Sequence, residues 1–311
     1  MPDPCQPTPA PRPRGAGTVS LVGAGPGDPE LLTVQAIKAI RRASVLLVDD
    51  LVGAGVLRYA RRSARIIPVG KRGGAPTAAP RGGPPDAGRP CVRHSTPQDF
   101  IHRLMVAEAQ RGETVVRLKG GDPFIFGRGG EEVEHLRRAG IEVRIVNGIS
   151  SGLAASTALG VPWTHREHAH GVLLVTGHAG DAGSELNWPT LAAAVAQRLT
   201  LVVYMGVQRL EHIRSGLLPT LGALTPAALV QRASTAQERS LVTTLGRLSI
   251  DAARAGIGSP AILIVGDVLK GVQAARETVR LQSAPSVSDE RGSQPAHTHA
   301  RISASGGSPR R

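Results

Sequence analysis

The sequence contains few aromatic residues, almost no cysteine and no long apolar run. Only 2% of its 311 residues are aromatic and only two are cysteine. Cys5 and Cys91 stand apart in Pro- and Gly-rich stretches, so neither a disulfide framework nor a cysteine metal site is expected. No apolar run approaches the about 18 residues of a membrane span, and the N-terminal stretch MPDPCQPTPAPRPRG lacks the apolar core of a signal peptide. These absences favour a cytoplasmic protein.

The formal net charge of +13 raises nucleic acid as a partner. The basic residues are spread along the chain without a Lys/Arg block interleaved with aromatics, and so few aromatic residues cannot build stacking platforms for single strands. A diffusely basic surface suits a small polyanionic substrate equally well. We therefore expect a small-molecule substrate, with neither nucleic acid nor a membrane as a partner.

Composition divides the chain into segments. Residues 1–17 are Pro-rich and residues 271–311 are rich in Ser, Ala, Arg and Gly without periodicity, so both are expected to be disordered. Between residues 73 and 93, ten of 21 residues are Gly or Pro, which indicates an insertion. The remainder alternates short apolar runs with helical patterns. This predicts two tandem α/β domains, residues 18–148 and 149–270, with a mainly parallel sheet in the first and a ligand cleft between the domains.

The periodicity also predicts individual elements. Strands are expected in the first domain at Thr18–Val22, Val45–Val48, Arg65–Val69, Val115–Leu118 and Val143–Val146. Helices are expected at Leu31–Arg42, Pro97–Gln110, Glu131–Ala139 and Ser150–Leu159. A second set of apolar segments runs over Val172–Thr176, Leu191–Ala196, Leu201–Met205, Ala227–Val230, Arg239–Thr244 and Ala261–Val265.

One stretch, VVRLKGGDPFIFGRGGEE at Val115–Glu132, organises the first domain. Its apolar start predicts a buried strand, and the Gly-Gly-Asp at residues 120–122 lets a ligand approach bare backbone at the carboxyl end of that strand. A tight βα turn is the alternative. Two glycine clusters around two of the chain's three phenylalanines favour a ligand site. Glu131 and Glu132 then begin a helix, where carboxylates suit the positive end of the dipole.

The turn GAGPGD at residues 23–28 partly matches the dinucleotide-binding pattern GxGxxG. Asp49 and Asp50 end the next strand, near the distance expected of a ribose-binding carboxylate. However, Pro26 removes a backbone N–H where a pyrophosphate needs donors, and the third glycine does not fall inside the helix. Dinucleotide binding is therefore kept only as an alternative.

Five motifs, in order, resemble the tetrapyrrole methylase family: VSLVGAGPGDPELLT at residues 19–33, VGKR at 69–72, RLKGGDPFIFGRGGEE at 117–132, VPWTHR at 161–166 and VTGH at 175–178. The resemblance covers about residues 18–270. It implies a fold of two α/β domains, a homodimer, and S-adenosyl-L-methionine as methyl donor in the cleft between the domains, with no metal.

Within the family, the motifs are most similar to members that methylate uroporphyrinogen III at C2 and C7, giving precorrin-2 for sirohaem or cobalamin. One alternative keeps the fold and changes the acceptor to a later corrin precursor or a non-tetrapyrrole. Another is a nucleotide-binding or nucleic-acid-associated protein without catalytic activity. Thr164–Arg166 and Gly70–Arg72 favour the first reading, and the presence of Asp49, Lys71 and Asp122 disfavours the last.

By motif position, the resemblance implies donor contacts at Pro26, Gly120, Gly121, Asp122, Ile125, Ser150, Ser151, Met205 and Ala233. It implies Asp49 as proton acceptor and Lys71 as proton donor. A base is chemically reasonable because methylation of a pyrrole carbon leaves a cationic adduct that must lose a proton. The alternatives are a strand-end cap for Asp49 and a carboxylate anchor for Lys71. Candidates for binding the substrate's carboxylates are Arg72, Arg128 and Arg166.

Some positions depart from the family pattern. Asn147 stands where proline is usual, Ala233 replaces a usual glycine, and Val48 precedes Asp49 where tyrosine is common. The insertion at residues 73–93 separates two motifs that family members join by a few residues. None of the departures removes a charged group from the expected site.

Four histidines lie close together in sequence: His165, His168, His170 and His178. Their spacing does not match a metal triad, and the residues between them are not on an expected helix. Structural hydrogen bonding is therefore the expected role, and no metal is predicted.

Overall fold

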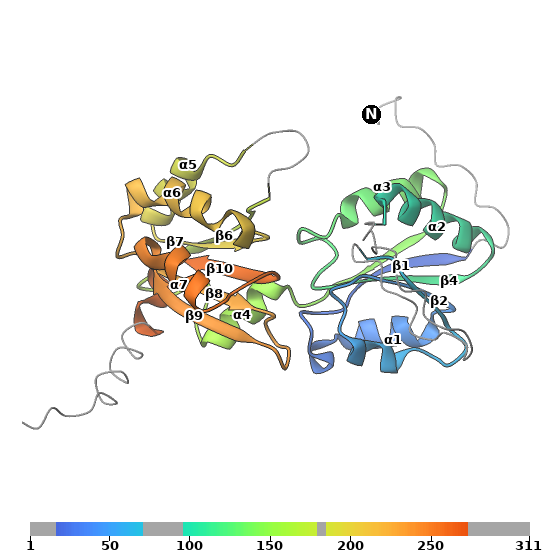
Figure 1. Ribbon diagram of the computed structural model, residues 1–311. Coiled ribbons are helices and arrows are strands. Elements are labelled where there is room, and N and C mark those ends of the chain that lie inside the picture. The colour runs from blue at the N-terminus through green and yellow to red at the C-terminus, as the bar shows by residue number, and fades with distance from the viewer. Residues whose placement is uncertain (1–16, 71–95, 179–184, 273–311) are drawn as a thin grey trace, which may run out of the picture.

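The structure is a computed structural model that describes residues 17–70, 96–178 and 185–272 (Figure 1). The expected insertion, nearly all of the two expected tails, and both Lys71 and Arg72 lie outside the described residues. The described chain forms two five-stranded sheets with helices packed on both. No helix in this part of the chain is long and apolar enough to cross a bilayer.

The first sheet is wholly parallel, with strand order β3-β2-β4-β1-β5. Its strands are β1 (Thr18–Gly23), β2 (Val45–Val48), β3 (Arg65–Pro68), β4 (Thr114–Lys119) and β5 (Val143–Val146). In register, Val115 of β4 lies between Val19 of β1 and Val45 of β2. All five strands agree with the expected ones to within one residue at each end, because each is a short apolar run bounded by polar or turn residues.

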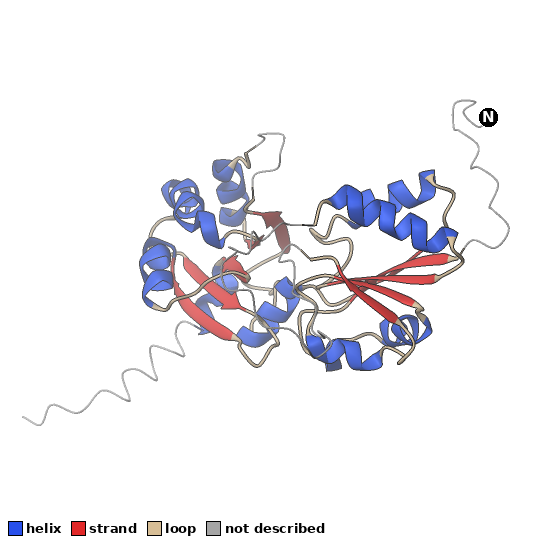
Figure 2. Ribbon diagram, turned by 45° about the vertical axis from the view of Figure 1, so that its right-hand side comes forward, coloured by secondary structure: helices blue, strands red, loops and turns tan. Residues whose placement is uncertain are grey.

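Helices cover both faces of this sheet (Figure 2): α2 (Gln98–Gln110) and α3 (Gly129–Arg138) on one face, and α1 (Val34–Arg42) on the other. Successive strand residues point to opposite faces. Val19 and Leu21 accordingly pack with α2 and α3, whereas Val22 packs with α1. Two short 3-10 helices complete this part, at Pro29–Leu31 and Ala54–Tyr59.

The first helix begins later than the sequence suggested. Pro29–Leu31 forms a 3-10 turn capped by Asp28, whose carboxylate accepts a backbone N–H at 2.9 Å. The α-helix starts only after Thr33, whose hydroxyl accepts a second backbone N–H at 3.1 Å. Two consecutive caps therefore split the expected Leu31–Arg42 helix into a turn and a helix.

The second sheet has strand order β6-β7-β10-β8-β9 and is mixed. Its strands are β6 (Gly171–Thr176), β7 (Leu199–Tyr204), β8 (Pro226–Gln231), β9 (Arg239–Thr244) and β10 (Ala261–Val265). Only β6 and β7 pair in parallel; the other three pairings are antiparallel. The mainly parallel sheet expected for the first domain is thus confirmed, whereas the second sheet is mixed. The reason is visible between β8 and β9, where a short link allows a hairpin but not a parallel crossover.

Helices also cover both faces of the second sheet: α5 (Trp188–Ala196), α6 (Leu210–Leu221) and α7 (Leu248–Arg254) on one face, and α4 (Ser151–Leu159) on the other. Short 3-10 helices lie at Val207–Arg209, Leu245–Arg247 and Asp267–Leu269. The α4 helix follows β5 of the first sheet in sequence but packs on the second sheet through Ala154 and Ala155. The division of the chain between residues 148 and 149 stays a proposal; it falls between β5 and α4.

Candidate active site

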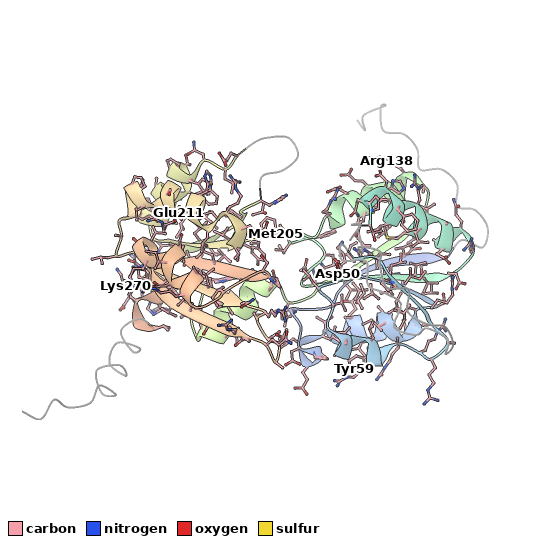
Figure 3. All side chains as sticks on the ribbon, viewed as in Figure 1. Asp50, Tyr59, Arg138, Met205, Glu211 and Lys270 are labelled. Atoms are coloured by element: carbon pink, nitrogen blue, oxygen red, sulfur yellow. The ribbon has the colours of Figure 1, made fainter. Side chains whose placement is uncertain are left out.

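A cavity of about 660 Å³ lies where the carboxyl ends of β1, β2 and β4 meet the second sheet. Its volume falls in the range of about 300 to 1,000 Å³ typical of small-molecule sites. Asp50 and Met205, which both line it, belong to opposite sides and lie toward the middle of the molecule in Figure 3. The parallel sheet thus presents its strand ends to a ligand, as open α/β sheets do.

All nine positions expected to contact a methyl donor line this cavity: Pro26, Gly120, Gly121, Asp122, Ile125, Ser150, Ser151, Met205 and Ala233. Asp49, the expected proton acceptor, lines it as well. These ten residues come from six separate loops and strand ends. The fold therefore brings residues from separate sequence motifs together around one cavity.

Two expected substrate-binding residues do not belong to the lining. Arg128 pairs with Glu131 at 2.6 Å at the start of α3, and Arg166 is exposed in the loop before β6. Lys71 and Arg72 lie outside the described residues. The roles of all four in substrate binding or proton transfer stay predictions.

Glycine backbone forms one wall of the cavity. Gly25 and Gly121 exchange two hydrogen bonds, at 3.2 and 2.7 Å, and Gly121 has a φ of +69°. A Cβ on Gly148 would lie 2.2 Å from the carbonyl oxygen of Gly121. The loops after β1, β4 and β5 therefore approach each other more closely than side chains would allow.

The buried carboxylate of Asp122 joins two of these loops. One oxygen accepts the backbone N–H of Phe124 at 2.8 Å, and the other accepts the Asn147 side-chain amide at 3.1 Å and the backbone N–H of Gly148 at 3.0 Å. Asn147, which departs from the family pattern, thus supplies one of the three bonds. Asp122 acts first of all as the anchor of the glycine loops.

On the opposite wall, Tyr204 connects the two parts of the molecule. Its hydroxyl lies 2.7 Å from the Ser150 hydroxyl, and its ring lies 4.8 Å from the ring of Phe126. Burial raises the pKa of Tyr204, so the phenol stays neutral. Phe126 and Met205 both have positive φ, near +50°, a strained conformation that concentrates at functional sites. Tyr204 was not anticipated from the sequence; its place at the end of an apolar strand was the available signal.

The family model for tetrapyrrole (corrin/porphyrin) methylases matches residues 18–249. The chain belongs to this family. It is 48% identical over 258 residues to the uroporphyrinogen-III C-methyltransferase of Pseudomonas aeruginosa, covering 83% of this chain and 96% of that protein. It is 43% identical to a sirohaem synthase of Azotobacter vinelandii, covering 83% of this chain but only 51% of that longer protein.

A solved structure gives the same result for the fold. The uroporphyrin-III C-methyltransferase of Thermus thermophilus, in complex with S-adenosyl-homocysteine, superposes with a TM-score of 0.64 at 39% identity. The comparison covers 82% of this chain and 99% of that one. The expected fold class, an α/β tetrapyrrole methylase fold, is confirmed.

Beneath the cavity floor, this tetrapyrrole methylase carries a group of buried charges that the sequence analysis did not single out. Arg117 and Lys119 are each 3% exposed, and Glu132 is fully buried. Glu132 lies in the first turn of α3, as expected, and its carboxylate also contacts both cations. Burial, and next the charge of Arg117, lowers the pKa of Lys119. The signal for this group was the presence of two cations in a strand expected to be buried. Buried charges require partners, so an anion was to be expected beside them.

The methylase also has a histidine hairpin away from this cavity. His165 and Ala169 exchange two backbone hydrogen bonds of 2.9 Å, which brings ligand atoms of His165, Glu167 and His168 within 4.8 Å of one another. The two rings stack at 4.6 Å. Sequence spacing alone did not suggest this grouping, because it depends on the turn. The structural role expected for these histidines stays a prediction.

Proposed function

We propose that this chain is an S-adenosyl-L-methionine-dependent methyltransferase that methylates uroporphyrinogen III at C2 and C7. The product is precorrin-2, a precursor for sirohaem, cobalamin or both. The observation that carries the proposal is that nine family-implied donor contacts and Asp49 line a single cavity. The similarity to uroporphyrinogen-III C-methyltransferases over nearly their whole length supports the choice of substrate.

The cavity has the properties that this donor requires. Bare backbone at Gly120 and Gly121 leaves room for a ligand to approach closely. Ser150 and Ser151 lie at the N-terminus of α4, whose positive dipole end suits a carboxylate. Ile125 and Met205 offer apolar surface. A molecule with an amino-acid end and an adenosine end therefore finds both polar and apolar partners.

The reaction requires alignment of the methyl donor with the acceptor carbon, and it requires a base. S-adenosyl-L-methionine supplies a methyl group bound to a sulfonium sulfur. Transfer of the methyl group leaves a neutral thioether. A new C–C bond forms at an electron-rich pyrrole carbon, so the tetrapyrrole becomes cationic and must release a proton. We assign that proton to Asp49, whose carboxylate lines the cavity and is 30% exposed.

The substrate carries eight carboxylates, so its binding calls for cations. We propose Arg72, Arg128 and Arg166 for this role, and Lys71 either as a carboxylate anchor or as a proton donor. The net charge of +13 favours the approach of a polyanion.

We also propose that the enzyme is a cytoplasmic homodimer, as the family resemblance implies. Light scattering coupled to size-exclusion chromatography measures the mass directly. A mass near 64 kDa is expected, which is about twice the 32.3 kDa chain. A mass near that of a single chain would contradict the dimer.

Activity is tested by incubating the purified protein with methyl-labelled donor and uroporphyrinogen III under anaerobic conditions. We expect two labelled methyl groups per tetrapyrrole by mass spectrometry. Asp49→Asn serves as the matched control and should bind donor while forming little product. Label in added RNA or in a later corrin precursor, with none in uroporphyrinogen III, would replace this substrate by the alternative acceptor.

A further inference from the structure

Two cations lie in the interior of the first sheet, just before the glycine turn of the cavity. Arg117 and Lys119 alternate along β4 with Val116 and Leu118, which pack toward α1. They therefore face α2 and α3, on the same side as Val115. Among the described residues they are the only Lys or Arg side chains that are buried.

Both cations share a single buried anion. The Oε1 atom of Glu132 accepts from Arg117 Nε at 3.2 Å, from Lys119 Nζ at 3.0 Å and from Gln98 Nε2 at 3.1 Å. One carboxylate neutralises only one of the two positive charges. Because a buried uncompensated charge is costly, a second anion is expected close by.

That second anion is Asp49. Arg117 Nη2 lies 3.6 Å from Asp49 Oδ2, and Asp49 lines the cavity. With Asp49, the four charges balance. The carboxylate that lines the cavity is therefore electrostatically linked, through Arg117, to the buried glutamate of α3.

Arg117 is fixed on its other sides. Its Nη1 donates to the backbone carbonyls of Leu47 and Leu118, at 3.4 and 3.3 Å, while Nε holds Glu132. The guanidinium is planar, so fixing two of its nitrogens also fixes the third. The position of Nη2 is thus determined by the sheet and by α3.

Asp49 is consequently held at both oxygens. Oδ1 accepts the backbone N–H of Asp50 at 2.8 Å, and Oδ2 faces Arg117. The distance of 3.6 Å is longer than a hydrogen bond. Arg117 therefore attracts the carboxylate and orients it without occupying the lone pair that would take a proton.

We infer that Arg117, held in place by Glu132, is a positioning residue that aims the Asp49 carboxylate at the proton released after methyl transfer. The inference rests on the proposed function. An acid–base group acts only when its atoms are within reach, and a displacement of about 1 Å can cost on the order of 100-fold in rate. Lys119 balances the charge of this group and lines the cavity.

The test is a double-mutant cycle between Arg117→Lys and Asp49→Asn. Lysine keeps a positive charge but loses the fork that reaches both Glu132 and Asp49. We expect Arg117→Lys to lower kcat by about tenfold or more, with the Kd for S-adenosyl-L-methionine within about twofold of wild type. In the Asp49→Asn background the same substitution should change kcat by less than about twofold, because the carboxylate that Arg117 positions is absent.

Glu132→Gln provides a second variant, and it carries the test if Arg117→Lys fails to bind donor. It should lower kcat in the same background-dependent way. Glu108→Gln is the matched control: Glu108 is also buried, with 2% of its surface exposed, and pairs with two arginines, Arg65 and Arg111, but is not part of the cavity lining. Its kcat should equal that of wild type.

The outcomes separate the inference from the proposed function. Equal losses from Arg117→Lys in both backgrounds, or an equal loss in Glu108→Gln, would assign Arg117 a purely structural role and overturn the inference alone. If Asp49→Asn keeps the wild-type kcat, Asp49 is not the base. The inference is then overturned, while the methyltransferase function stands. Absence of any methylated tetrapyrrole with the wild-type protein would overturn both.

Discussion

At the scale of single residues, Asp122 shows how a loop residue serves a ligand site. Its carboxylate takes three hydrogen bonds from two loops, and those loops contain Gly120, Gly121 and Gly148. Each hydrogen bond to a charged acceptor contributes about 1.5 to 3 kcal/mol. Donor affinity should therefore depend on Asp122 through loop geometry, even where the carboxylate itself does not touch the donor.

Asp122→Ala is expected to raise the Kd for S-adenosyl-L-methionine by about tenfold or more, which corresponds to at least about 1.4 kcal/mol. Its effect on the KM for the tetrapyrrole should be smaller. Asn147→Ala removes only one of the three bonds and should cost less. Calorimetric titration measures both variants. An unchanged donor affinity in Asp122→Ala would refute the anchoring role.

The close backbone approach at Gly148 gives a second residue-scale prediction. A Cβ there would lie 2.2 Å from the Gly121 carbonyl oxygen, whereas a Cβ on Gly130 would meet nothing within 4 Å. Gly148→Ala should therefore lower the free energy of unfolding by about 1 to 3 kcal/mol, as overpacking does. Gly130→Ala, in the first turn of α3, should be neutral or stabilising. Urea unfolding compares the two; equal stabilities would contradict the steric argument.

The motifs named residues that the structure places around one cavity, and they missed residues whose role depends on burial. Asp49 and the nine donor positions follow from motif order. The partners of Arg117 do not, because Glu132 lies on another element and its burial is decided by how α3 packs on the sheet. Tyr204 was missed for a similar reason: its contacts with Ser150 and Phe126 join segments far apart in sequence.

At the scale of elements, strands were easier to predict than their pairing. The strand Ala261–Val265 was predicted to the residue, yet it pairs antiparallel to both neighbours. Periodicity reports which residues are buried but not the direction of the neighbouring strand. Helices α6 and α7 were not predicted: Pro219 lies within the first, and the second has only seven residues.

The contact between α2 and α3 includes a buried histidine, and we expect it to make stability depend on pH. His102 is buried, and its ring stacks on His135 at 4.7 Å. Burial, and then the neighbouring His135, lowers the pKa of His102 below its usual value of 6.5. The unfolded chain therefore binds more protons near and below pH 6.5, and this group's contribution to stability is lost as the pH falls through that range.

His102→Gln should accordingly reduce the loss of stability between pH 7.5 and pH 5.5, because an amide does not titrate. His170→Gln, at an exposed histidine outside this contact, is the control and should keep the wild-type dependence. Urea unfolding at the two pH values gives the comparison. If His102→Gln leaves the pH dependence of the free energy of unfolding unaltered, other titrating groups cause that dependence.

At the scale of the whole molecule, hydrogen bonds between loops connect the two halves of the site. The backbone N–H of Asp28 donates to Ser234 Oγ at 3.2 Å, and the hydroxyls of Ser150 and Tyr204 lie 2.7 Å apart. The cavity is thus built from loop segments at the ends of separate sheets. Changes elsewhere in the chain should leave donor binding intact as long as these loops keep their places.

The insertion offers a direct test of whether donor binding is independent of segments outside these loops. Residues 73–93 lie outside the described structure, but the two residues that flank the undescribed segment are joined: Thr96 Oγ1 donates to the Gly70 carbonyl at 3.0 Å. Ends that already meet can be connected by a shorter link, and halving a loop changes closure entropy by only about 0.6 kcal/mol.

Deleting residues 74–90 should therefore lower the Tm by less than about 5 °C and leave the Kd for S-adenosyl-L-methionine within about twofold of wild type. The KM for the tetrapyrrole should change, because the deletion begins just after Lys71 and Arg72, the proposed carboxylate-binding cations. Replacing residues 74–90 by a Gly/Ser linker of equal length separates the effect of length from that of composition. Calorimetry gives Tm and Kd, and initial rates give KM. A larger drop in Tm would mean that the segment contributes to the packed structure and is not an insertion.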